Sequence, residues 1–239
     1  SRISSTTREA FTKSSFKDCT VISNRMKYNV TTKLKYEVMT KVQKMAIPVA
    51  ITGKDCLVKA KTGTGKTVAF LIPSIDRVSQ QTSLEERKGK VQILIISPTR
   101  ELASQIEAEA KPMVAETQLT VQAVVGGTSI DRDKKIFRKL KFPDILVATP
   151  GRVIDHLTSD SGLKGACDKL KCLIFDEADR LLEMGFRPVI TELLKQLPAK
   201  KTRQTLLFSA TMPEDTMDIA KFALRDDFET VDAVGTDQG

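Results

Sequence analysis

The stretch that decides the fold of this chain is Ala60-Lys61-Thr62-Gly63-Thr64-Gly65-Lys66-Thr67. Apolar runs lie on both sides of it, so we expect a strand, a glycine-rich turn and then a helix. Gly63 and Gly65 allow the backbone N–H groups and the start of the helix to face an anion. Lys66 can then reach the β- and γ-phosphates of a nucleotide, and the Thr67 hydroxyl can bind Mg²⁺. The pattern therefore predicts a phosphate-binding loop.

The loop departs from the general phosphate-loop pattern at Ala60, where that pattern has glycine. An ordinary strand–turn–helix junction that happens to contain two glycines is the alternative interpretation. The motifs in the rest of the chain decide between the two.

Length and composition indicate a globular protein with a polyanionic partner. The 239 residues can form one large domain or two small ones, and 41% of them are hydrophobic, with a mean hydropathy of −0.18. The formal charge of +8 favours a polyanion as partner, although a solvated basic surface is the plainer alternative. No apolar run is long enough to span a bilayer and no secretory leader is visible, so we expect a soluble protein with no membrane partner.

Cysteine and histidine usage excludes several kinds of site. The four cysteines form no C-x-x-C pair, and a single histidine, His156, cannot supply a metal-ligand set or a Ser/His triad. Cys56 and Cys172 lie in apolar runs and are interpreted as reduced core thiols, which favours an intracellular location. The Ser/Thr-rich, basic start of the chain is compatible with an organelle-targeting remnant, so mitochondrion or plastid against nucleus or cytoplasm stays open.

Short apolar runs alternate with helical stretches through the chain, which predicts a wound α/β fold around a parallel sheet. We expect residues 1–15 to be a flexible lead-in, residues 16–43 to be largely helical, and residues 78–90 to form a surface loop. Beyond the strand at residues 56–58, the expected strands are Val91–Ser97, Val121–Val125, Ile145–Thr149, Cys172–Asp176 and Thr205–Ser209. The expected helices are Val42–Ile51, Glu101–Ala115, Lys134–Leu140, Val153–Leu157, Ala178–Leu197 and Glu214–Phe222.

Polar clusters directly follow the predicted strands, at the edge of a wound sheet where ligands bind. One of them, Asp176-Glu177, comes after an apolar strand. Beside a phosphate loop, the first carboxylate can hold Mg²⁺ and the second can orient or deprotonate the attacking water. Capping of the following helix is the alternative role for Asp176 and Asp179. The other clusters are Pro98-Thr99-Arg100-Glu101-Leu102, Gly126-Gly127, Thr149-Pro150-Gly151-Arg152 and Ser209-Ala210-Thr211.

Together these motifs, with the tetrad Asp176-Glu177-Ala178-Asp179, resemble the DEAD-box RNA helicase family, and its organellar and plant branch most. The family's phosphate loop normally begins with alanine, so Ala60 fits. The resemblance implies a RecA-like phosphate-loop domain over residues 16–232, with a mostly parallel sheet and helices on both faces, then a flexible tail at 233–239. A second RecA-like domain, which carries the family's arginine finger, is expected to be absent because few residues follow Thr211.

The resemblance also implies how ATP is bound. Gln43 corresponds to the glutamine that reads adenine, because an amide can pair with both N6 and N7. Tyr36 and Thr40 belong to the same motif, and Phe16 is expected to pack on the adenine. Lys35 and Met39 depart from the family's usual Gly and Pro. The phosphate contacts are expected from Thr62, Gly63, Thr64, Gly65, Lys66 and Thr67.

Further roles follow from the resemblance for the remaining motifs. Mg²⁺ is assigned to Thr67 and Asp176, and catalysis to Lys66, Asp176 and Glu177. The coupling of ATP to RNA is assigned to Asp179, Ser209 and Thr211. The RNA backbone, bound with little sequence specificity, is assigned to Arg100, Gly126, Gly127, Thr149, Gly151 and Arg152.

The resemblance implies an ATP-dependent RNA helicase, here its N-terminal ATP-binding domain, acting as a monomer. The parent protein is expected to open short RNA duplexes, whereas residues 1–239 alone are expected to bind ATP and hydrolyse it poorly. An ATP-gated RNA clamp or scaffold uses the same residues and stays open as an alternative. A DNA translocase is disfavoured by the full set of motifs.

Overall fold

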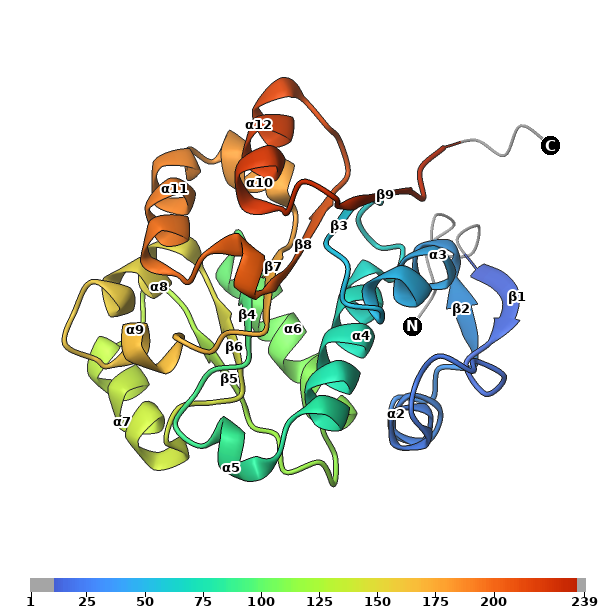
Figure 1. The fold of residues 1–239 in the computed structure, drawn as a ribbon, viewed down its shortest axis with the longest axis horizontal. Helices are drawn as coiled ribbons and strands as arrows, with labels where there is room; N and C mark the ends of the chain where they lie inside the picture. Colours follow the sequence, from blue (N-terminus) through green and yellow to red (C-terminus); the bar gives the residue numbers. More distant parts are fainter. Residues whose placement is uncertain (1–10, 236–239) are drawn as a thin grey trace.

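The computed structural model describes residues 11–235, and its centre is a seven-stranded sheet in the order β5-β6-β4-β7-β8-β3-β9 (Figure 1). Every pair of neighbours in this sheet is parallel. The strands are β3 (Cys56–Lys59), β4 (Ile93–Ile96), β5 (Val121–Val124), β6 (Ile145–Ala148), β7 (Cys172–Phe175), β8 (Gln204–Ser209) and β9 (Glu229–Asp232). The predicted wound α/β class is confirmed.

Helices cover both faces of the sheet because successive strand residues point to opposite faces and both sets are apolar. In β4, Ile93 and Ile95 pack into one buried cluster, whereas Leu94 and Ile96 pack into the other. The first face is covered by α3 (Lys41–Ala50), α4 (Lys66–Gln81) and α6 (Arg100–Met113). The second is covered mainly by α7 (Ile130–Leu140), α8 (Pro150–Leu157), α9 (Leu163–Ala166), α10 (Ala178–Glu183), α11 (Arg187–Gln196) and α12 (Glu214–Ala223).

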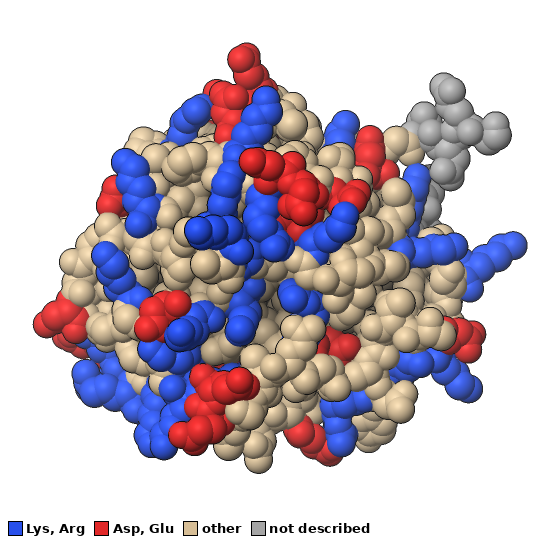
Figure 2. All heavy atoms as spheres, in the orientation of Figure 1, with Lys and Arg blue, Asp and Glu red and all other residues tan. Residues whose placement is uncertain are grey.

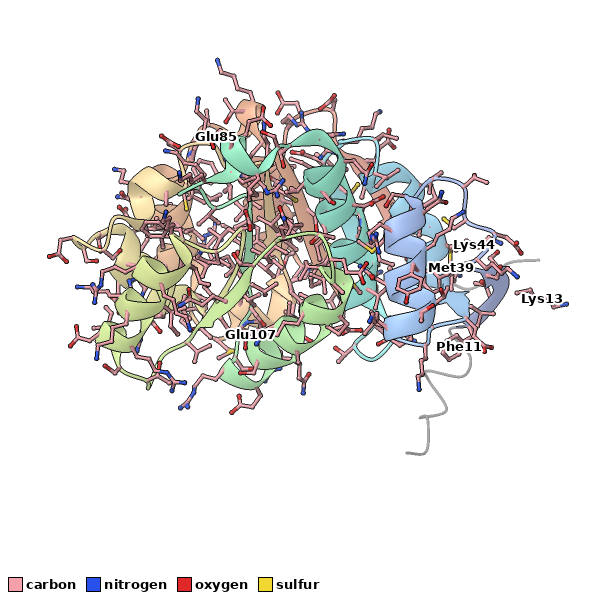
Figure 3. The ribbon with its side chains drawn as sticks, turned by 90° about the horizontal axis from the view of Figure 1, so that it is seen from below. Phe11, Lys13, Met39, Lys44, Glu85 and Glu107 are labelled. Carbon is pink, nitrogen blue, oxygen red and sulfur yellow. The ribbon has the colours of Figure 1, made fainter. Side chains whose placement is uncertain are left out.

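The segment before α3 differs from the prediction. Residues 11–15, expected in a flexible lead-in, form strand β1 (Phe11–Ser15), which pairs antiparallel with β2 (Val38–Thr40). Besides β2, the stretch 16–43, which was expected to be largely helical, contains α2 (Asn24–Tyr28), the π-helical turn η1 (Asn29–Lys33) and the first turn of α3. Figure 3 shows this small sheet at one end of the molecule, beside α3. The expected mobility of residues 1–10 and 236–239 lies outside the described residues.

Two further predictions are corrected. The single helix expected over residues 178–197 is two helices, because Gly185 takes a left-handed conformation (φ 85°) between α10 and α11. The loop expected over residues 78–90 contains the last turn of α4 and the short helix α5 (Leu84–Arg87). Arg87 of α5 is buried, and its charge is paired with Asp144, the residue before β6, at 3.4 Å.

The two edge strands of the sheet are β9 and β5. β9, which the sequence analysis did not predict, extends the sheet by pairing with β3. At the other edge, Glu107 of α6 accepts a hydrogen bond from the backbone N–H of Ala123 in β5, at 2.6 Å. Figure 3 labels Glu107 on α6. The Glu107 contact occupies one backbone group that an open edge would leave free for other chains.

Candidate nucleotide site and nucleic-acid interface

The phosphate loop joins the carboxyl end of β3 to the first turn of α4, as its sequence predicts. Gly63 (φ 80°) and Gly65 (φ 85°) both take left-handed conformations that other residues rarely adopt. A Cβ atom on Gly65 would lie 2.5 Å from the side-chain nitrogen of Gln43. Glycine is therefore required at residue 65 by both its backbone angle and its surroundings.

Lys66, the first residue of α4, forms the charged centre of the site. Its Nζ lies 3.1 Å from Asp176 Oδ1 and 3.1 Å from Glu177 Oε1. All three side chains are buried, so these charges interact through little water. Burial raises the pKa of Asp176, and the charge of Lys66 opposes that rise. The ion pairs thus favour the charged form that a metal ligand requires.

Glu177 follows β7 in a strained conformation, with φ 50°. Such angles are costly for a residue with a side chain and gather at functional sites. Three groups hold its carboxylate in place: Lys66, the Thr62 hydroxyl at 3.4 Å and Arg180 at 3.3 Å. The carboxylate is therefore oriented towards the phosphate loop.

A cavity of about 300 Å³ lies between the phosphate loop, α6 and the two carboxylates. Its oxygen donors come from Thr62, Thr67, Asp176, Glu177 and Glu109, and oxygen is the ligand type that Mg²⁺ prefers. No group of three or more His, Cys, Asp or Glu side chains with metal-site spacing occurs in residues 11–235. The donor set fits Mg²⁺ as phosphate-loop proteins hold it, by one or two protein oxygens with phosphates and water completing the shell.

Gln43 connects α3 to the phosphate loop. Its amide nitrogen donates to the Gly65 carbonyl at 3.1 Å, and its amide oxygen accepts from the Thr40 N–H at 2.9 Å. Thr40 in turn caps α3 by accepting from the Gln43 N–H, which completes a capping box. The structure brings Thr40 and Gln43 to the nucleotide site, and adenine reading by Gln43 stays a prediction.

Phe16 does not reach this site. Its side chain is fully buried in the core and its N–H donates to the Glu37 carbonyl at 2.9 Å. The expectation that Phe16 packs on adenine is therefore corrected for this structure, because no face of its ring is accessible. Tyr36 lies closer, and its hydroxyl donates to Glu109 of the cavity wall at 2.7 Å. Burial, followed by this contact, raises the pKa of Tyr36.

The three residues assigned to coupling are joined by hydrogen bonds. Asp179 Oδ2 accepts from the Thr211 hydroxyl at 2.9 Å and from the Thr211 N–H at 3.1 Å. The Asp179 N–H donates to Ser209 Oγ at 3.1 Å, and Ser209 Oγ donates to the Thr211 carbonyl at 2.7 Å. A shift of α10 would therefore move the end of β8, and the converse also holds.

The six residues assigned to RNA, here called the glycine edge, follow β4, β5 and β6. The Gly126 N–H donates to Thr149 Oγ1 at 3.1 Å, so one loop holds the next. Gly127 has a left-handed backbone (φ 79°), and a Cβ there would lie 2.7 Å from Nη1 of the exposed Arg100. The members of the glycine edge are Arg100, Gly126, Gly127, Thr149, Gly151 and Arg152.

Arg152 differs from the expectation that it offers its charge to RNA. It is only 9% exposed and donates to the Thr128 carbonyl at 2.6 Å and to Asp133 at 2.8 Å. The same oxygen of Asp133 lies 2.9 Å from Nε2 of the fully buried His156. Arg152 thus holds the loop after Gly127 in place from its buried side.

Sequence reasoning missed Asp133 and left His156 without a role. The four-residue spacing of Arg152 and His156 places both on one side of α8, which was an available signal. Their shared partner Asp133 comes from α7, and nothing in the sequence pairs the two helices.

Comparison with known proteins gives the family. A family model described as DEAD/DEAH box helicase matches residues 40–219. DEAD-box ATP-dependent RNA helicase 26 of Oryza sativa subsp. japonica is 44% identical over 200 residues, which cover 83% of this chain and 36% of that protein. DEAD-box ATP-dependent RNA helicase 31 of Arabidopsis thaliana is 47% identical over 203 residues, covering 83% of this chain and 28% of that protein.

A solved structure agrees with these relatives. The crystal structure of a DEAD box protein from the hyperthermophile Methanococcus jannaschii superposes with a TM-score of 0.77 at 30% identity, covering 92% of this chain and 56% of that one. The chain spans about a third of the length of the plant relatives. The family model matches residues 40–219, which is more than half of the chain and includes the phosphate loop, the paired carboxylates and the Ser209–Thr211 segment. This chain therefore belongs to the DEAD/DEAH box helicase family.

Proposed function

We propose that this chain is the N-terminal ATP-binding domain of an ATP-dependent RNA helicase that unwinds or remodels short RNA duplexes. The observation that carries the proposal is the contact of Lys66 with both Asp176 and Glu177 inside one cavity with the phosphate loop. A loop for phosphates, a ligand for a metal and a base for water are the parts that phosphoryl transfer to water requires.

The proposed division of labour at the ATP site follows from the position of each group. The backbone of residues 62–65 and Lys66 bind the phosphates, while Thr67 and Asp176 hold Mg²⁺. When bound, Mg²⁺ neutralises charge that develops on the phosphates. Glu177 orients the attacking water and accepts its proton, because its carboxylate is fixed by partners on three sides.

The proposed RNA contact is made by the glycine edge. Exposed Arg100 supplies charge, and Gly126, Gly127 and Gly151 bring backbone N–H groups close to sugar and phosphate. Backbone N–H groups and a single arginine that contact sugar and phosphate do not read the edges of the bases, so little sequence specificity is expected. The basic charge of the whole chain supports a polyanionic partner.

We further propose that a second RecA-like domain completes both sites. The family resemblance places an arginine finger in that domain, and such a group contributes about 10³–10⁵ in rate in other systems. Residues 1–239 alone should therefore bind ATP, act as a monomer and hydrolyse ATP slowly. The network of Asp179, Ser209 and Thr211 is proposed to transmit domain closure to the carboxylates.

The test is steady-state phosphate release by the parent protein with and without single-stranded RNA. Glu177→Gln should keep ATP binding and lose about 10²–10⁴ in turnover, as loss of a positioned base does. Glu183→Gln, at an exposed residue of α10, the helix that Glu177 precedes, is the matched control and should keep normal turnover. Near-normal turnover of Glu177→Gln would show that Glu177 is not the base.

Unwinding separates the proposed helicase from an ATP-gated RNA clamp. A helicase should displace a short RNA strand at a rate that follows phosphate release. A clamp should instead hold RNA for longer with ATP bound and displace little of the strand. Stimulation of ATPase by single-stranded DNA as strong as by RNA would point to a DNA translocase.

We propose an intracellular, reducing location for the protein. In residues 11–235 all four cysteines are free, and burial raises the pKa of Cys56, Cys167 and Cys172 to about 12. Thiols of this kind are not built for disulfide exchange. No helix within the same residues is long and apolar enough to cross a membrane. Localising a tagged parent protein would choose between organelle and cytoplasm or nucleus.

A further inference from the structure

A second cavity, of about 270 Å³, lies at the opposite end of the sheet from the phosphate loop. Its walls come from residues that precede β3, β7 and β8 and from the last turns of α4. Arg77 of this wall is eleven residues along α4 from Lys66, or about 16 Å. The cavity is therefore separate from the nucleotide site and the glycine edge.

Five cationic side chains line this cavity, which we call the basic cavity. Only one has a carboxylate partner, because Arg225 pairs with buried Asp55 at 2.8 Å. None of the other four forms an ion pair with a carboxylate within residues 11–235. The five are Arg77, Lys171, Lys201, Arg203 and Arg225. Figure 2 shows that Lys and Arg gather near the centre of the face viewed there, with some acidic side chains beside them.

The two inner arginines, Arg77 and Arg203, are held in place by neutral groups, and no ion pair involves them within residues 11–235. Arg77 Nη1 donates to Gln204 Oε1 at 2.6 Å, and Arg77 Nε is buried with no hydrogen-bond partner. Arg203 is 4% exposed, and its partners are the neutral Pro198 carbonyl and the Thr205 hydroxyl. Burial lowers the pKa of Arg203 because the charged form has lost water, and the nearby charge of Asp55 opposes this effect without forming an ion pair with it. A charge that is partly removed from water and not paired is unfavourable until an anion approaches it.

The chemistry of the cavity selects among anions. No aromatic side chain lines it, so it offers bases nothing to stack on, in contrast to sites for single-stranded nucleic acid. Its volume lies just below the usual range of ligand pockets, which favours a small ligand. Two rigid guanidinium groups beside two mobile ammonium groups suit phosphate oxygens that carry several charges.

We propose that the basic cavity binds a compact, multiply charged phosphate compound, at a site distinct from that for ATP. Arg77 and Arg203 contact the anion from inside, and Lys171 and Lys201 contact it from the rim. Gln204 fixes Arg77, since its amide also donates to the Ala50 and Lys54 carbonyls at 2.7 and 2.8 Å.

The test is a titration of isotope-labelled residues 1–239 with inorganic pyrophosphate, in which the amide resonances are followed by NMR. The titration is done in 150 mM salt, where the Debye length is about 8 Å and general electrostatic attraction is screened. Pyrophosphate also suits the phosphate loop, so the position of the shifts matters. We expect saturable shifts at Gly53, Thr202 and Gln204, separate from those at Gly63 and Gly65. Shifts confined to the phosphate loop would overturn the proposal.

Paired variants distinguish a built site from general attraction. The double variant Lys171→Gln, Lys201→Gln removes two exposed rim charges. It should lower the affinity for pyrophosphate, measured from the shifts at the basic cavity, at least tenfold. The double variant Lys164→Gln, Lys195→Gln removes two exposed charges elsewhere on the protein and should lower that affinity less than twofold. Equal weakening by both pairs would overturn the proposal. So would shifts of these amides by single-stranded RNA and not by pyrophosphate, which would mark an RNA contact instead.

Discussion

Two buried basic residues near the proposed ligands, Lys66 and Arg152, are used differently. Lys66 lies 3.1 Å from each of two carboxylates that line the nucleotide cavity. Arg152 lies 2.8 Å from Asp133, on the inner side of the glycine edge, and its other contact is with the Thr128 backbone. The first cation faces the cavity proposed to bind ATP, and the second faces away from the surface proposed to bind RNA.

The difference shows what each motif does for its ligand. In the proposed function, the charges at the phosphate loop are themselves the binding and reacting groups. At the glycine edge, buried Thr149 and Arg152 hold the loops after β5 and β6 in shape. Under the proposed function, the groups left to contact RNA are backbone N–H groups and the exposed Arg100. Changes at the two regions should therefore differ in stability, in ligand affinity and in salt dependence.

The largest effect is expected from Lys66→Ala. This change leaves two buried carboxylates without their cation, and breaking a buried pair in this way costs about 3–5 kcal/mol. The free energy of unfolding of residues 1–239 in urea measures it, and calorimetry should show loss of ATP binding. Lys61→Ala, an exposed lysine of the same loop, is the control and should change the stability little.

The loss in the free energy of unfolding caused by Lys66→Ala should also grow with pH. Burial already raises the pKa of Asp176, and Lys66 holds that rise back, so the variant has a still higher pKa. A carboxyl whose folded pKa is raised loses stability as pH increases from its unfolded pKa to its folded pKa. Unfolding at pH 5 and pH 8 should give the larger deficit at pH 8. A deficit that is equal at both would show that Asp176 is not the group left uncompensated.

The second effect is expected from Asp133→Asn. It removes the charge that Arg152 and His156 share, and hydrogen bonds to charged groups contribute about 1.5–3 kcal/mol. RNA affinity should fall because the Thr128 loop loosens, but its salt dependence should not change, since no phosphate contact is lost. Filter binding over a salt series measures both, with exposed Asp131→Asn as the control. A reduced salt slope would mean that Arg152 contacts phosphate directly.

The parts of the fold that the sequence predicted are those where local chemistry decides the structure. Short apolar runs such as Ile145–Thr149 favour strands buried on both faces, and the spacing of Gly63 and Gly65 before Lys66 favours a tight turn. Residues 16–43 were misjudged because β2 is held by β1, a partner that no local pattern reveals. The break at Gly185 was missed because a single glycine is compatible with a helix interior.

The same distinction holds for the site. Asp176 and Glu177 follow directly from their strand, whereas the burial of Phe16 and the role of Arg152 depend on distant packing. A motif position gives the residue type that a family uses there. It does not say whether the side chain faces the ligand or the core, which is decided by tertiary partners such as Asp133 and Glu37.

A smaller effect is expected from Gln43→Ala. The variant loses the capping box of α3 and the contact with the Gly65 carbonyl, which should lower stability by about 0.5–2 kcal/mol. Calorimetry with ADP and GDP should show weaker ADP binding and a narrower preference for adenine. Lys44→Ala, the exposed neighbour in α3, should keep the preference. Equal affinity of the unchanged protein for ADP and GDP would sink the adenine assignment.

The smallest change in stability, and the sharpest test of the comparison, is expected from Arg100→Gln. Arg100 is exposed and forms no ion pair within residues 11–235, so the free energy of unfolding should change by less than about 0.5 kcal/mol. If Arg100 neutralises one phosphate of single-stranded RNA, the slope of log affinity against log salt should decrease by about 0.7. Arg138→Gln, an exposed arginine of α7, should leave that slope unchanged. Asp133→Asn is expected to lower RNA affinity without changing its salt slope, whereas Arg100→Gln is expected to lower the salt slope without changing the free energy of unfolding. The two variants should therefore separate residues that hold the loops of the glycine edge in shape from the residue that contacts RNA. If both variants gave the same salt slope and the same free energy of unfolding, Asp133 and Arg100 would not have these different roles.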